Sequence, residues 1–175
     1  VVSILFLIVF ALKAGLFLFF WLPGSYSAPS AAVTALFGGL LTKVGLYAII
    51  RTFTLIFYHD PGFTHSLIGY MATATMILGG IGAVAFRDIN RILCYNVVAG
   101  VGFIAFGVAA ANRDALEGIV FYLMHDMIVK ALLFLLGGIL IAAAGTDRLK
   151  EMGGLIKSYP VLGWMFFTAA LALIG

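Results

Sequence analysis

The sequence contains few charged residues. Asp, Glu, Lys and Arg make up 10% of its 175 residues, hydrophobic residues make up 64%, and the mean hydropathy is +1.19. A soluble domain has about 25% charged and about 45–50% apolar residues. The composition therefore excludes an ordinary soluble domain and predicts an integral membrane protein. In such a protein the net charge of +3 is weak evidence for nucleic-acid binding, and we expect no nucleic-acid partner.

Residues that bind metals are also scarce. Cys94 is the single cysteine, which excludes an internal disulfide, a cysteine-based metal cluster and an iron–sulfur site within this sequence. His59, Asp60 and His65 lie close together between two apolar runs, but two histidines and one aspartate do not define a metal site. We therefore expect neither a metal nor another cofactor.

Long apolar runs fill the rest of the chain, and a spanning helix needs about 20 such residues. Breaker pairs such as Pro23-Gly24 separate the runs. The runs predict helices over about residues 1–22, 30–57, 63–86, 89–111 and 115–144, with a truncated sixth over 160–175. Because the sequence begins without an initiator Met and stops inside an apolar run, we expect residues 1–175 to be the central part of one larger, all-α transmembrane domain.

The charges of the connecting loops predict the orientation. The loops after the first, third and fifth predicted helices share one side of the membrane. That side holds most of the basic loop residues, namely Arg87, Arg91, Arg148, Lys150 and Lys157. The other side holds Arg113, with Arg51 near a helix end. An excess of Lys and Arg marks the cytoplasmic side, so we expect the first helix to enter from outside.

Three lysines, Lys13, Lys43 and Lys130, lie near the middle of apolar runs. A lysine at the bilayer centre costs about 2.5–3.5 kcal/mol on insertion scales. Burial disfavours the charged form of the side chain, so a buried lysine can gain and lose a proton near physiological pH. We interpret the three lysines as parts of a polar path for protons across the membrane. The alternatives are lysines that are paired inside the bundle or that extend to the interface.

Two of the predicted helices carry further polar groups. Lys43, Tyr47 and Arg51 follow Gly39 at four-residue spacing, which predicts that they share one helix face. We favour a hydrated strip that lines the proton path, with Tyr47 in a supporting role. The alternative is a polar seam between helices, with Arg51 at the lipid headgroups.

The helix predicted over residues 115–144 holds Tyr122, His125, Asp126 and Lys130. Asp126 and Lys130 are four residues apart and can form an ion pair, and Tyr122 lies one turn earlier. The unperturbed side chain of His125 titrates near neutrality. This group is either a static pair that makes Lys130 tolerable or a relay in which pairs open and close as protons pass.

The sequence resembles the antiporter-like membrane subunits. This family includes the proton-pumping membrane subunits of respiratory complex I, an NADH:quinone oxidoreductase, and the large subunits of Mrp-type Na⁺/H⁺ antiporters. The resemblance lies in FALKAGLFLFFWLPGSYSAPSAAVTALFGGLLTKVGLYAIIRTF, RDINRILCYN, FYLMHDMIVKALLFLLGG and MGGLIKSYPVLGWMFF. The phrases LPGSY, YHDPGFTH and HDMIVKALLF are most similar to the Mrp members.

The resemblance implies a fourteen-helix bundle with inverted repeats, to which this chain would contribute the seventh helix through the first half of the twelfth. The family's lysines on the seventh, eighth and eleventh helices match Lys13, Lys43 and Lys130, and its histidine on the eleventh matches His125. The glutamate partner of Lys13 would lie upstream of this sequence. The family's proline after the Lys13 position is missing here, and Gly100 stands where many relatives have histidine or glutamine.

The resemblance also implies a function. We expect a secondary transporter subunit that moves protons in a multi-subunit Na⁺/H⁺ antiporter of the bacterial cytoplasmic membrane, without redox chemistry of its own. Its partners would be the other subunits of the complex, membrane lipid, protons and Na⁺. One alternative is a proton-pumping subunit of a complex I-type oxidoreductase, and another is a structural scaffold. Replacing Lys13 by alanine is expected to abolish exchange in the first case while assembly stays intact.

Overall fold

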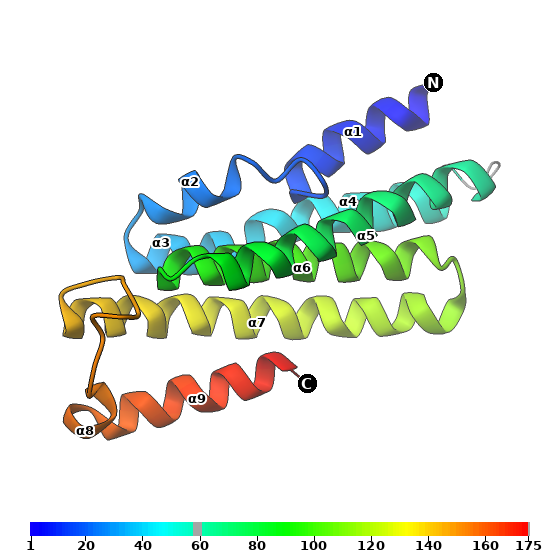
Figure 1. The fold of residues 1–175 in the computed structure, drawn as a ribbon. Coiled ribbons are helices and arrows are strands. Elements are labelled where there is room, and N and C mark those ends of the chain that lie inside the picture. Colours follow the sequence, from blue (N-terminus) through cyan, green and yellow to red (C-terminus); the bar gives the residue numbers. More distant parts are fainter. Residues whose placement is uncertain (58–60, 175) are drawn as a thin grey trace.

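The computed structural model describes residues 1–57 and 61–174, so His59 and Asp60 of the expected loop lie outside the described residues. Regular structure in this part of the chain is helical, as the all-α class predicted. The elements are α1 Val2–Ala14, α2 Leu22–Ser27, α3 Ala31–Leu36, η1 Phe37–Leu41, α4 Thr42–Leu55, α5 Pro61–Ala85, α6 Ile89–Ala109, α7 Arg113–Ala144, α8 Leu155–Ser158 and α9 Pro160–Ile174. The long helices lie side by side, with α7 between α9 and the other long helices (Figure 1).

Four helical segments are long and apolar enough to cross a membrane. They are Ala31–Leu55, Gly62–Ala85, Ile89–Ala109 and Arg113–Ala144. These segments correspond to the second to fifth helices expected from the sequence. The first of them combines α3, η1 and α4, because a π-helical turn and not a loop joins its two α-helical parts.

The first helix differs from the expectation, because α1 ends at Ala14 and not near residue 22. Gly15 follows with a φ of 75° and Phe17 has a φ of 62°, both in the left-handed region. The N–H of Phe17 donates to the Oγ1 atom of Thr75 on α5 at 2.8 Å, which satisfies a backbone donor that the broken helix leaves free. The chain therefore breaks directly after Lys13 although the family's proline is missing.

The loops on either side of α6 and α7 confirm part of the predicted topology. The N–H of Ile89 donates to the carbonyl of Asp147 at 3.1 Å, and the N–H of Leu149 donates to the carbonyl of Arg87 at 3.0 Å. These bonds join the loop between α5 and α6 to the loop after α7 at one end of the bundle (Figure 1). The loops after the third and fifth predicted helices therefore share one side, as expected.

Helix α1 packs closely against α4 at a glycine. A Cβ atom placed on Gly45 would meet the backbone nitrogen of Ala14 at 2.5 Å, which is too close for any side chain. Small residues allow membrane helices to approach in this way. The contact fixes the end of α1, and with it Lys13, beside the part of α4 that begins with Thr42 and Lys43.

Candidate functional site

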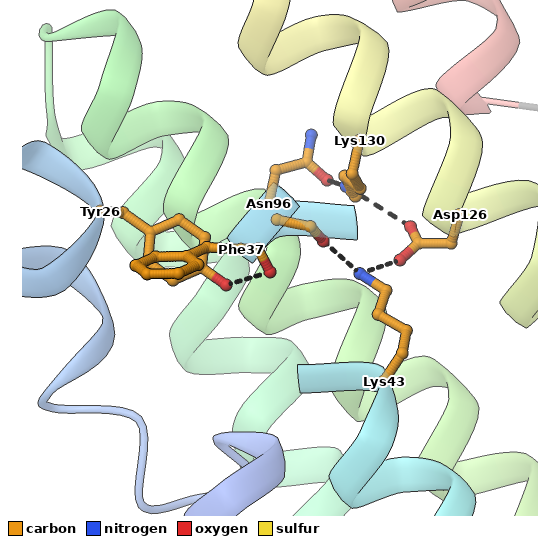
Figure 2. A network of polar contacts seen from close by, with 7 residues as sticks. Tyr26, Phe37, Lys43, Asn96, Asp126 and Lys130 are labelled. Atoms are coloured by element: carbon orange, nitrogen blue, oxygen red, sulfur yellow. Dashed lines mark hydrogen bonds and ion pairs between the residues drawn. The ribbon is translucent and has the colours of Figure 1, made fainter. Parts of the chain in front are cut away.

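Charged side chains from α4 and α7 meet inside the bundle. The Nζ atom of Lys43 lies 2.8 Å from Oδ2 of Asp126, and the Nζ atom of Lys130 lies 3.7 Å from Oδ1 of the same carboxylate. The exposed fractions of the three side chains are 3%, 1% and 1% in the order Lys43, Lys130 and Asp126. Figure 2 shows both lysines directed at the carboxylate. The expected contact between Asp126 and Lys130 is present, and the structure adds Lys43, which the spacing within one helix did not reveal.

Two ammonium groups share one carboxylate in this cluster, so it holds one excess positive charge when all three groups are ionised. Neutral oxygens accept further hydrogen bonds from the lysines. Lys43 Nζ donates to the carbonyl of Gly38 at 2.8 Å, and Lys130 Nζ donates to Oδ1 of Asn96 on α6. A buried ion is tolerated only when such hydrogen bonds replace those it made to water. The sequence analysis missed Asn96, whose signal was a single amide inside an otherwise apolar stretch of helix.

The carbonyl that binds Lys43 belongs to the π-helical turn η1. Lys43 therefore bonds to a carbonyl five residues earlier on its own helical segment. The neighbouring carbonyl of Phe37 accepts a hydrogen bond from the hydroxyl of Tyr26 at 2.9 Å (Figure 2). Single π-helical turns inside α-helices occur frequently at functional sites. Here the turn presents two backbone oxygens to side chains.

Gly100 of α6 makes room for the Asp126 carboxylate. A Cβ atom on Gly100 would lie 3.1 Å from Oδ1 and 3.4 Å from Oδ2. Both oxygens are buried, and among the described residues only the two ammonium groups contact them as partners. The negative charge of Asp126 is therefore stabilised by the lysines and not by a shell of neutral donors.

His125 and Tyr122 lie on α7 beside the cluster and not in it. Both side chains are half-buried, and their ring centroids are 6.2 Å apart. The ring of Tyr122 also packs on that of Phe103, with 4.7 Å between centroids. Tyr122 is near enough to interact electrostatically with Asp126. Neither residue forms an ion pair or hydrogen bond with a lysine in the part of the chain that the structure describes.

Lys13 is not part of the cluster either. Its side chain is exposed at the last turn of α1. There it borders an apolar depression of about 470 Å³ together with Leu12, Phe20 and Trp21. A charged side chain in an apolar surface of a membrane protein calls for a partner, and this chain provides none among its described residues.

The face predicted for Lys43, Tyr47 and Arg51 is divided in the structure. Lys43 is buried, whereas Tyr47 is 57% exposed and its ring lies 5.8 Å from the guanidinium carbon of Arg51. Four residues advance a helix by slightly more than one turn, so each step of four rotates the position by about 40°. Over two such steps the polar stripe turns from the interior to the surface.

Comparison with known proteins identifies relatives along the whole chain. The sequence model of the family described as "NADH:quinone oxidoreductase/Mrp antiporter, TM" matches residues 1–175. A Na⁺/H⁺ antiporter subunit of Bacillus subtilis (strain 168) is 56% identical over 176 residues, covering 100% of this chain and 36% of that protein. The protein of the same name from Alkalihalophilus pseudofirmus is 54% identical, with the same coverage. The chain thus spans about a third of the length of these relatives.

The fold also resembles a solved structure. A chain of the membrane-bound sulfane sulfur reductase, an archaeal respiratory membrane complex, matches with a TM-score of 0.81 and 24% sequence identity. The match covers 94% of this chain and 37% of that one. At this identity the likeness shows a shared fold and nothing further.

Proposed function

The chain belongs to the family of NADH:quinone oxidoreductase and Mrp antiporter membrane subunits, and from this premise we propose that it is the central part of a proton-translocating subunit of a multi-subunit Na⁺/H⁺ antiporter in the bacterial cytoplasmic membrane. The names of the relatives support the antiporter and its further subunits. The observation that carries the proposal is the buried cluster of Lys43, Asp126 and Lys130 in helices long enough to span a membrane.

The cluster moves charge because its three groups depend on one another. At an effective dielectric constant of about 20, unit charges about 4 Å apart interact by about 4 kcal/mol. When Lys130 releases a proton, Asp126 is left to Lys43 alone, and the repulsion between the two ammonium groups ends. When a proton returns, the repulsion returns with it. The protonation state of one lysine therefore biases that of the other, which passes charge along the path.

The remaining predicted residues extend this path. His125 and Tyr122 lie beside the cluster on α7 and connect it to neighbouring polar groups through hydration. Lys13 serves as the next proton carrier, and its exposed face receives the carboxylate that the resemblance places upstream of this sequence. Tyr47 supports the path from the outer face of α4. Sodium and lipid contact the complete subunit within the assembled complex.

A second candidate is a proton-pumping subunit of a respiratory oxidoreductase. The fold shared with a chain of an archaeal respiratory membrane complex favours it. The two candidates differ in their driving force. Exchange in vesicles that depends on Na⁺ and not on NADH supports the antiporter, and the reverse dependence supports the pump.

The test uses the full-length protein in its complete complex, in everted vesicles, with Na⁺-driven proton exchange as the readout. Lys43→Met leaves Asp126 paired with Lys130, so we expect an assembled complex on a native gel that no longer exchanges. Lys13→Ala is expected to give the same result. Lys150→Met, the same change in an exposed loop lysine, is the matched control and keeps wild-type exchange. Normal exchange in an assembled Lys43→Met complex contradicts the proposal, and loss of assembly in both lysine variants favours the scaffold.

A further inference from the structure

Asn96 is a neutral side chain that contacts the charged cluster from a third helix. It lies on α6, and its Oδ1 atom accepts a hydrogen bond from Nζ of Lys130 (Figure 2). An asparagine neither gains nor loses a proton in the physiological range, so it cannot relay one. Its amide oxygen can only attract the ammonium group toward α6.

The two lysines are held unequally by Asp126. Lys43 lies 2.8 Å from the carboxylate, whereas Lys130 lies 3.7 Å from it. The longer distance is not imposed by the helix, because residues four apart on one helix face can form close pairs. The difference lies in the second partner of each lysine. Lys43 bonds to Gly38 of its own helical segment, while Lys130 bonds to a side chain on another helix.

We propose that Asn96 is a positioning residue that draws the Lys130 ammonium away from Asp126 and so reserves the carboxylate for Lys43. This inference rests on the proposed function, since it names what sets the resting state of the relay. With Asn96 in place, Lys130 keeps a neutral acceptor and a loose ionic contact. It is thus the lysine that changes protonation state first, while Lys43 stays paired.

The first test is Asn96→Leu in the full-length subunit within its complex. Leucine has a similar size and no acceptor, so Lys130 moves onto Asp126 and competes with Lys43. We expect exchange in everted vesicles to fall by about 10-fold to 100-fold, as for a lost hydrogen bond to a charged group, with assembly retained. Asn90→Leu is the matched control, because Asn90 lies on the same helix and has no hydrogen bond within the described residues.

A second variant separates positioning from packing. Asn96→Asp keeps the shape and the acceptor but gives Lys130 a carboxylate of its own. Lys130 is then held in its charged form, and exchange is expected to fall by a similar factor although packing is unchanged. A merely structural role predicts normal exchange in this variant, and that result overturns the proposal. The variant also covers the case in which Asn96→Leu fails to assemble.

A third measurement does not depend on transport. The loss of thermal stability on Asn96→Leu is measured in the wild-type complex and in a Lys130→Met complex, where Asn96 has no ammonium to hold. We expect a lower unfolding temperature only in the first background, and equal losses in both overturn the inference. If Lys43→Met and Lys130→Met abolish exchange while both Asn96 variants exchange normally, the inference on Asn96 fails and the proposed function stands. If the lysine variants themselves exchange normally, the proposed function fails.

Discussion

Replacing Asp126 by asparagine removes the shared charge of the cluster while keeping the shape of the side chain. The change leaves Lys43 and Lys130, which are 3% and 1% exposed, without a carboxylate. The hydrogen bonds to Gly38 and Asn96 remain, but they provide no negative charge. Two ammonium groups then face each other in an apolar interior.

The magnitude follows from the two distances. At an effective dielectric constant of about 20, the contacts at 2.8 Å and 3.7 Å correspond to gross attractions of about 6 and about 4.5 kcal/mol. Most of this attraction offsets the cost of burying the ions, and removing one partner of a buried pair costs about 3–5 kcal/mol in measured cases. This energy corresponds to a factor of about 10² to 10⁴ in a protonation equilibrium. One lysine is therefore expected to stay neutral and to stop cycling.

The assay is Na⁺-driven proton exchange in everted vesicles that contain the full-length subunit in its complex. We expect the Asp126→Asn complex to lose at least about 100-fold in exchange rate, the lower end of the range above. Asp88→Asn is the control, because Asp88 pairs with the half-exposed Arg91 at 3.5 Å. A surface pair of this kind contributes about 0–1 kcal/mol, so exchange is expected to stay at the wild-type rate.

A double variant distinguishes lost assembly from lost transport. Lys43→Met combined with Asp126→Asn removes one charge of each sign, so the cluster keeps the same net charge as the wild type. We expect this complex to assemble as well as the wild type and still not to exchange. An assembled Asp126→Asn complex that exchanges protons at the wild-type rate would refute the reasoning.

Two further predictions concern the packing around the site. Gly45→Ala places a Cβ against the backbone of Ala14, so we expect a loss of about 1–3 kcal/mol in stability, seen as a lower unfolding temperature of the complex. Gly80→Ala, where a Cβ meets nothing within 4 Å, is its control, and equal effects of the two would contradict the close approach. Asn112→Ala removes the side chain that accepts from the N–H of Ala115 at 2.7 Å at the start of α7. We expect a cost of about 1 kcal/mol and faster hydrogen exchange in that first turn, and unchanged exchange there would argue against the cap.

Sequence patterns predicted the spanning helices well, because length and apolar composition decide whether a segment crosses a membrane. They did not predict the break after Lys13, since the run is apolar throughout and the broken backbone is satisfied by Thr75 from a distant helix. The spacing within α7 indicated the contact of Asp126 with Lys130. It gave no information on Lys43, whose meeting with Asp126 depends on how α4 packs against α7.

The short first helix places its own electric field on Lys13. Helix α1 has 13 residues and is about 20 Å long, whereas the apolar core of a bilayer is about 30 Å thick. The aligned peptide groups of a helix put about half a negative charge at its carboxyl end. Lys13 lies in that last turn, so the broken backbone itself serves as a partial counter-ion for its ammonium group. The charge on Lys13 is thereby stabilised by main-chain atoms, which no exchange of side chains along the path removes.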